Sequence, residues 1–194
     1  MLLLRWSGLL IFVTGASLGL ASGDARAQEP PQAEAPAGVD VGTAAPKFTL
    51  KDQDGSERSL DDFLKQGKVA LVFFRSADWC PFCRKQLAQL QADSKRFEDA
   101  GIQLVGISYD SPEVLKSFTD KNKIAFPLLS DPSSKTIDAY QIRNTQAKGK
   151  SEGIPRPGTF VLDSAGKIRA KLFLEDYRER HTAEALLKAA LAAQ

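Results

Sequence analysis

The chain has few of the side chains that bind metals: in 194 residues there are two cysteines, Cys80 and Cys83, and one histidine, His181. A tetrahedral zinc site usually needs four protein ligands, which these residues do not supply. A copper site would need His181, which begins the last predicted helix, beyond the last predicted strand, where a solvated side chain is the simpler expectation. The shortage of histidine also argues against a cysteine-histidine hydrolase. We therefore predict no metal site and no cofactor.

A large excess of charge is also missing. The formal net charge is +2, from 26 lysines and arginines against 24 aspartates and glutamates. So small an imbalance provides no electrostatic argument for binding to nucleic acid or to an anionic membrane surface. We therefore predict that the chain has no nucleic-acid partner.

No apolar run is as long as a membrane-spanning helix, which takes about 20 residues. The longest extends from about Leu9 to Leu20, follows the basic residue Arg5, and is followed by Ala25-Arg26-Ala27. A basic start, an apolar stretch and an A-x-A pattern are typical of a secretory signal peptide. We therefore expect a signal peptide over residues 1–27, cleaved after its last alanine. The mature protein would be periplasmic or secreted, without stable membrane insertion.

Two further segments follow the expected signal peptide. Residues 28–45 are rich in proline and alanine and almost free of large apolar side chains, which is typical of an extended or disordered linker. Residues 46–194 contain the apolar periodicity of a folded domain, and no internal repeat. A domain of this length can bury a hydrophobic core of its own. We therefore predict one domain.

Within the domain, strand and helix patterns alternate. The runs 68–74 and 102–107 are continuously apolar, which is typical of strands buried on both faces. A glycine-containing turn between 159–162 and 168–173 indicates a hairpin. Right-handed crossovers make the first two buried strands parallel, so we predict an α/β fold, a thioredoxin-like α/β/α sandwich with a central mixed sheet. Other expected elements are a strand at 48–51, an apolar segment at 126–129, and helices at 60–65, 81–100, from 111, 131–139 and 182–193.

Cys80 and Cys83 lie where the buried strand 68–74 gives way to a helix. A disulfide between them would close only a tiny loop, so little stabilisation is expected from it. Pro81 suits the first helical position, so the sulfur of Cys80 would face unpaired backbone N–H groups and the positive end of the helix dipole. Both lower the pKa of a thiol. This strand–CxxC–helix context predicts a redox-active pair.

Four more residues are candidates for this site. Trp79 and Phe82 would form an apolar rim against a substrate polypeptide. Pro157 directly precedes a strand and is placed for a cis peptide bond; in a thioredoxin-like arrangement it packs against the disulfide and keeps the backbone edge open. Arg156 is a candidate to hold a thiolate or a peroxide oxygen. The simpler alternatives are an ordinary strand-entry proline and a solvated loop arginine.

Several segments together resemble the AhpC/TSA family, the redoxin or peroxiredoxin-like branch of the thioredoxin superfamily. The resemblance covers about residues 40–192, most of the expected domain. Its fold would be the thioredoxin-like sandwich, and its chemistry would depend on cysteine. The segments that carry it are Val72–Cys83, Gly106–Pro112, Phe126–Asp131 and Thr159–Asp163.

Two branches of the superfamily imply opposite roles for the two cysteines. Exported thioredoxin-like reductases have a Trp-Cys-x-x-Cys motif whose first cysteine is the nucleophile, and Trp79-Cys80-Pro81-Phe82-Cys83 matches it. Peroxiredoxins instead carry Thr or Ser three residues before the peroxidatic cysteine. Aligned in that way, Cys83 is peroxidatic and Cys80 replaces the hydroxyl.

We therefore expect an exported thiol-disulfide oxidoreductase in which Cys80 forms a mixed disulfide and Cys83 resolves it. Its substrates would be protein thiols or disulfides, and its redox partner is unidentified. The alternative is a peroxiredoxin-like thiol peroxidase for hydroperoxides, with Cys83 oxidised to a sulfenic acid and Cys80 resolving it. A third hypothesis is a redox-inert binding module whose CxxC is a static disulfide.

Overall fold

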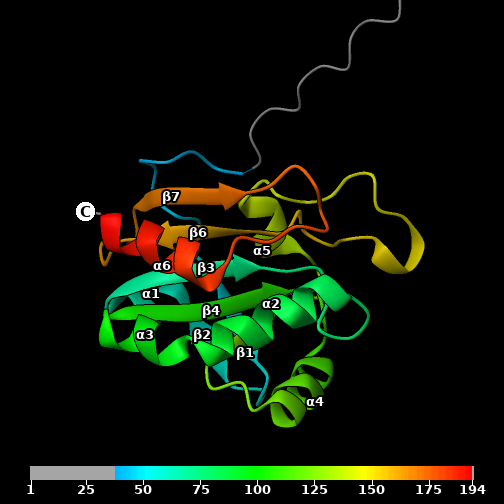
Figure 1. Ribbon diagram of the computed structural model, residues 1–194. Helices are drawn as coiled ribbons and strands as arrows, with labels where there is room; N and C mark the ends of the chain where they lie inside the picture. Colours follow the sequence, from blue (N-terminus) through cyan, green and yellow to red (C-terminus); the bar gives the residue numbers. More distant parts are fainter. Residues whose placement is uncertain (1–37, 194) are drawn as a thin grey trace, which may run out of the picture. The chain divides into compact units, whose positions relative to one another are not determined.

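A mixed β-sheet forms the centre of the computed structural model, which describes residues 38–193. In this part of the chain seven strands lie in the order β2-β1-β5-β4-β3-β6-β7 (Figure 1). The strands are β1 (Thr49–Asp52), β2 (Glu57–Ser59), β3 (Lys68–Phe73), β4 (Ile102–Ser108), β5 (Leu128–Ser130), β6 (Gly158–Leu162) and β7 (Ile168–Phe173). The helices are α1 (Leu60–Leu64), α2 (Pro81–Ala92), α3 (Ser94–Asp99), α4 (Pro112–Asn122), α5 (Lys135–Ala139) and α6 (Ala183–Ala192), with a 3-10 turn at Gly149–Ser151.

The central strand β3 contributes to two hydrophobic cores. Its residues point alternately to opposite faces, as the pleat of a strand requires. Val69, Leu71 and Phe73 pack on the face that α1 and α5 cover. Ala70 and Val72 pack on the other face, together with apolar side chains of α2, α3, α4 and α6. The predicted α/β/α sandwich with a central mixed sheet is therefore confirmed.

Strand pairing around β3 also follows the expectation. β3 and β4 are parallel, with Lys68 opposite Ile102 and Phe73 opposite Ile107. β6 and β7 form the predicted antiparallel hairpin, and β6 pairs antiparallel with the other edge of β3. Because β3 has neighbours on both sides, the loop that leaves its carboxyl end starts from a fixed position. That loop leads into the cysteine pair.

The structure differs from the prediction in several local features, including the helix expected over 131–139, which begins only at Lys135. The helix expected over 81–100 is divided into α2 and α3 by Asp93, whose backbone leaves the helical region at φ −98° and ψ 3°. Asp93 instead binds Arg96, and Phe97 of α3 is buried in the core. The strand β2 was not expected, because its sequence Glu-Arg-Ser lacks apolar residues; it forms by pairing with β1 in a hairpin.

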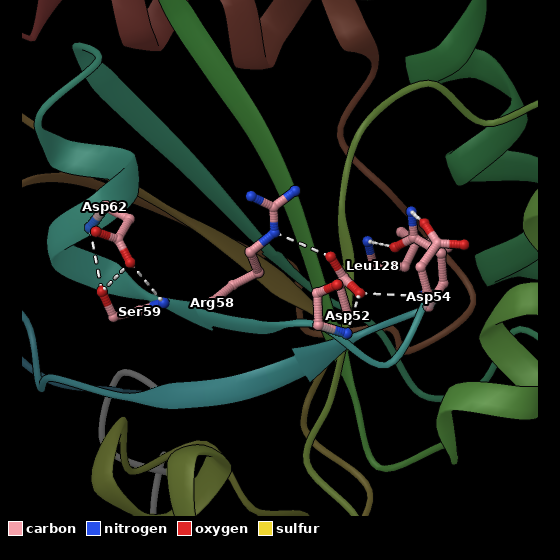
Figure 2. A network of polar contacts seen from close by, with 8 residues as sticks. Asp52, Asp54, Arg58, Ser59, Asp62 and Leu128 are labelled. Atoms are coloured by element: carbon pink, nitrogen blue, oxygen red, sulfur yellow. Dashed lines mark hydrogen bonds and ion pairs between the residues drawn. The ribbon is translucent and has the colours of Figure 1, made fainter.

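Polar side chains stabilise this hairpin and the helix that follows (Figure 2). The buried carboxylate of Asp52 accepts backbone N–H bonds within its own turn and a 2.9 Å bond from the guanidinium of Arg58. Ser59 caps α1: its hydroxyl oxygen accepts the N–H of Asp62, whose carboxylate accepts the N–H of Ser59 in return. Such a capping box satisfies N–H groups that a helix start leaves unpaired.

Residues 38–45, which the sequence assigns to the linker, lie against the domain. The N–H groups of Gly42 and Ala45 donate to carbonyls of the β6–β7 region, and the N–H of Ile168 donates back to Thr43. Ordered structure thus begins before the predicted start at residue 46, because these backbone groups pair with the sheet edge. The predicted signal peptide and residues 28–37 lie outside the described residues. Within residues 38–193 no helix combines the length and apolar character needed to cross a bilayer.

One buried hydroxyl in the core generates a stability prediction. Tyr140 is fully buried against Phe73 and Phe160, with ring centroids 5.0 and 5.2 Å away, and its hydroxyl has no hydrogen-bond partner within the described part of the chain. An unpaired buried polar group costs about 1–3 kcal/mol. We therefore expect Tyr140→Phe to raise the free energy of unfolding, by about 1 kcal/mol, in chemical denaturation. Phe160→Leu should lower it, and a loss of stability in Tyr140→Phe would contradict the prediction.

Candidate active site

The two cysteines occupy the first turn of α2. Both are free thiols and both are buried, at 1% exposure for Cys80 and 0% for Cys83. Cys80 is the N-cap residue, and its sulfur accepts the N–H of Cys83 at 3.3 Å. Pro81 takes the first helical position, as the sequence predicts. The strand–CxxC–helix context is therefore present, with the two sulfurs on the same turn.

Hydrogen-bond donors concentrate on Cys83. Its sulfur accepts the backbone N–H of Arg75 at 3.4 Å and Nη2 of Arg180 at 3.2 Å. The pKa of Cys83 is lowered to about 6, chiefly because the Cys80 thiol donates a hydrogen bond to it, with further help from the backbone N–H of Ser76 and the charge of Arg180. These interactions outweigh burial, which acts in the opposite direction. The contacts around Cys83 thus favour its thiolate form.

The Cys80 thiol behaves in the opposite way. Its pKa is raised, first because it donates its hydrogen to Cys83 and then because of burial. The backbone N–H of Cys83, at the helix start, favours the Cys80 anion, as the sequence analysis expected, but the contact with the Cys83 sulfur and burial outweigh it. The two pKa shifts therefore favour a negative charge on Cys83 and the proton on Cys80.

Arg180 is the contact that sequence reasoning missed. It comes from the segment between β7 and α6, 97 residues away from Cys83 in the chain. Its Nη1 atom donates to the backbone carbonyls of Tyr177 and Glu179, at 2.6 and 2.5 Å, which fixes the guanidinium over the site. No local pattern in Tyr-Arg-Glu-Arg-His identifies this arginine, because only the fold brings it to the cysteine.

A second arginine is enclosed by aromatic rings beside the pair. The guanidinium of Arg75 lies 4.8 Å from the ring centroids of both Trp79 and Tyr177, in cation–π geometry. The indole N–H of Trp79 donates to the hydroxyl of Tyr109, which donates to the carbonyl of Lys150. This stack joins the cysteine loop to the segment that carries Arg180.

The predicted rim residues lie at the protein surface. Trp79 is 37% exposed and Phe82 is 38% exposed, whereas the two cysteines between and beside them are buried. Aromatic side chains that are partly exposed offer apolar surface to a substrate or partner. Their placement therefore agrees with a rim around the pair.

Pro157 and Arg156 lie at the entry to β6. No peptide bond in residues 38–193 is cis, so the predicted cis bond before Pro157 is wrong. The segment runs straight into β6 because the N–H of Arg156 donates to the carbonyl of Ile142 and Gly158 pairs with Phe73. Pro157 lines a small cavity together with Arg180. Arg180 donates to Cys83, and the predicted roles of Arg156 and Pro157 at the pair stay predictions.

Comparison with known families agrees with this geometry. Residues 41–171, from before β1 to within β7, match the model of the AhpC/TSA family. The chain belongs to this family. The matched region contains β3, α2 and both cysteines, so the family assignment covers the redox pair itself.

Relatives within the AhpC/TSA family are peroxiredoxins. A Mycobacterium tuberculosis protein named as a peroxiredoxin is 41% identical over 129 residues, which is 66% of this chain and 80% of that protein. The chloroplastic peroxiredoxin Q of Populus jackii is 38% identical over 148 residues, 76% of this chain and 67% of that protein. The crystal structure of peroxidoxin BcpB from M. tuberculosis superimposes with a TM-score of 0.68 at 26% identity, covering 80% and 96% of the two chains. This family member is therefore a thiol-dependent oxidoreductase.

Replacing Arg180 tests its role in the thiolate. In a Cys80→Ser background, where a hydroxyl still donates and one thiol titrates, we expect Arg180→Met to raise the pKa of Cys83, because a positive charge and a hydrogen bond are lost. The thiolate absorbance should then rise at higher pH. Arg84→Met is the matched control: Arg84 lies on α2 next to Cys83, but its guanidinium donates to the carbonyl of Asp78 and not to the sulfur. An unchanged Cys83 pKa in Arg180→Met would show that Arg180 does not stabilise the thiolate.

Proposed function

We propose that this protein is a thiol peroxidase that reduces hydroperoxides, with Cys83 as the peroxidatic residue and Cys80 as the resolving residue. The observation that carries the proposal is the set of donors around Cys83, which favours a thiolate on that sulfur while Cys80 keeps its proton. The thiolate is the nucleophilic form of cysteine. Two peroxiredoxin relatives match this chain over two thirds or more of their own length, which supports the same reaction class.

The proposed reaction has two steps. The thiolate of Cys83 attacks one oxygen of the hydroperoxide and the O–O bond breaks; the sulfur becomes a sulfenic acid, and water or an alcohol leaves after taking up a proton. The sulfur of Cys80, after losing its proton, then attacks the sulfenic sulfur. An S–S bond forms, the S–O bond breaks, and the hydroxide leaves as water with that proton. An external thiol reductant, supplying two electrons, returns the pair to its starting state.

A small cavity next to Arg180 is a candidate entry point for the peroxide. Gln86, one helical turn after Cys83, lines it together with Pro157. Gln86 is 4% exposed, and its Oε1 atom has no hydrogen-bond partner in the described residues. The Nε atom of Arg180 has no hydrogen-bond partner there either. A hydroperoxide both donates and accepts hydrogen bonds, so it complements the unpaired acceptor of Gln86 and the unpaired donor of Arg180, two residues that line the same cavity.

Thiol-disulfide exchange with a polypeptide is the second candidate function. The exposure of Trp79 and Phe82 favours it, because aromatic rims of this kind contact an incoming protein segment. Exchange starting at Cys80 would require its sulfur to lose the proton that it shares with Cys83. The N-terminal signal pattern predicts an exported protein, and thiols outside the cytosol are not held reduced. A cysteine pair that cycles between dithiol and disulfide fits that location under either candidate function.

Variants of the two cysteines separate the two functions. In a peroxide-consumption assay we expect Cys83→Ser to abolish turnover. Cys80→Ser should still consume about one equivalent of peroxide and then stop, because the sulfenic acid forms but no disulfide does. The rate of the wild type should rise with pH through about 6, the pKa of Cys83, and then level off. Peroxide turnover that survives Cys83→Ser would contradict the peroxidatic role of Cys83, and faster reduction of insulin disulfides than of peroxide would favour exchange at Cys80.

Gln86 provides a test of the peroxide cavity. Gln86→Met keeps the side-chain length and removes the acceptor, so we expect kcat/KM for hydrogen peroxide to fall by about tenfold, the equivalent of one lost hydrogen bond. The matched control is Gln89→Met, an exposed glutamine on the same helix. Equal kcat/KM values in the two variants would place the peroxide elsewhere.

A further inference from the structure

A buried carboxylate lies behind the cysteine loop. Asp110 follows β4, and its residue is only 6% exposed. One carboxylate oxygen accepts the hydroxyl of Ser76 at 2.9 Å; the other accepts the backbone N–H of Ala77 at 2.7 Å and the hydroxyl of Ser108 at 3.0 Å. Asp110 thus joins the end of β4 to the loop between β3 and α2.

Ser76 extends this contact along the loop. Its hydroxyl oxygen accepts the backbone N–H of Asp78 at 3.0 Å and that of Trp79 at 3.4 Å. A serine oxygen has two lone pairs, so both are in use and its own hydrogen is directed to Asp110. Asp110 and Ser76 together therefore fix the backbone from residue 76 to residue 79, directly before Cys80.

The same loop supplies backbone donors to the reactive sulfur. The N–H of Arg75 donates to the sulfur of Cys83 at 3.4 Å, and the backbone N–H of Ser76 contributes to lowering the pKa of Cys83. Backbone donors stabilise an anion only while the loop holds their direction, because hydrogen bonds weaken steeply with angle. We propose that Asp110 is a positioning residue, which keeps these N–H groups aimed at the sulfur of Cys83 and thereby maintains its thiolate.

The charge of Asp110 does not offer a competing explanation. A carboxylate near a thiolate disfavours the anion, so neutralising Asp110 would promote the thiolate if charge were its main effect. The groups that face Cys83 are the Cys80 thiol, the Arg180 guanidinium and the loop N–H groups. Asp110 is itself buried among donors, with Asp78 as its neighbouring charge. If Asp110 acts through position, neutralising it should raise the pKa of Cys83. If it acts through charge, neutralising it should lower that pKa.

Asp110→Asn is the test variant. An amide has the shape of a carboxylate, but its NH₂ group would face either the N–H of Ala77 or the hydroxyl of Ser76, whose oxygen is already occupied. In the Cys80→Ser background, we expect thiolate titration to show the pKa of Cys83 raised by about one unit. The fraction of thiolate at pH values below the pKa then falls about tenfold. A lowered or unchanged pKa in a folded variant would overturn the proposal.

Asp131→Asn is the matched control. Asp131 is a second buried carboxylate, at 1% exposure, and it follows the neighbouring strand β5. It accepts the N–H of Ile137 in α5 at 2.9 Å and no N–H of the cysteine loop. We expect its substitution to lower stability but to leave the Cys83 titration in place. An equal rise of the Cys83 pKa in both variants would indicate a general loss of packing and would also overturn the proposal.

Ser76→Ala provides a second route if Asp110→Asn fails to fold. It keeps the backbone N–H of residue 76 and removes the hydroxyl that links Asp110 to Asp78 and Trp79, so the Cys83 pKa should rise in the same direction. An unchanged Cys83 pKa in Ser76→Ala would contradict the proposed positioning of the loop by Asp110 and Ser76. The inference deepens the proposed peroxidase function, but the titration uses no peroxide. A wild type without peroxidase activity would therefore defeat that function and leave this test standing.

Discussion

The rest of the active site depends on how a negative charge is held at a buried sulfur. An unpaired anion taken out of water is costly, so the protein must provide charge and hydrogen bonds to replace the lost solvent. Cys83 receives them from three sources: the Cys80 thiol, the backbone of the β3–α2 loop, and Arg180. Each source comes from a different part of the fold, so the chemistry of one atom depends on the packing of several elements.

The central sheet makes that convergence possible. β3 is paired on both edges, which fixes the point where the cysteine loop begins. β4, its parallel neighbour, ends beside this loop and brings Asp110 to it. β7 leads to the segment that carries Arg180, and the stack of Arg75 between Trp79 and Tyr177 holds this segment in place. The reactive sulfur therefore lies at the carboxyl end of β3, where ligands of α/β sheets commonly bind.

Local patterns account for most of what the sequence could predict. β3, β4 and the final hairpin were visible because buried strands are continuously apolar, and the first turn of α2 because Pro81 follows a cysteine at a strand end. Features that depend on distant partners were not visible. Arg180 reaches Cys83 only through the folded chain, so no local pattern could show which of the two sulfurs it contacts. Asp93 ends a helix whose apolar pattern continues into α3.

Stabilising a thiolate has a consequence for redox equilibrium. When Cys83 enters a disulfide its charge disappears, and Arg180 together with the loop N–H groups loses the anion they surround. The dithiol state is therefore favoured over the disulfide relative to an ordinary pair of cysteines. A pair whose reduced form is stabilised in this way has a higher reduction potential and is a stronger oxidant. The guanidinium that activates the sulfur thus also makes the resulting disulfide ready to pass its oxidising equivalents to the next thiol.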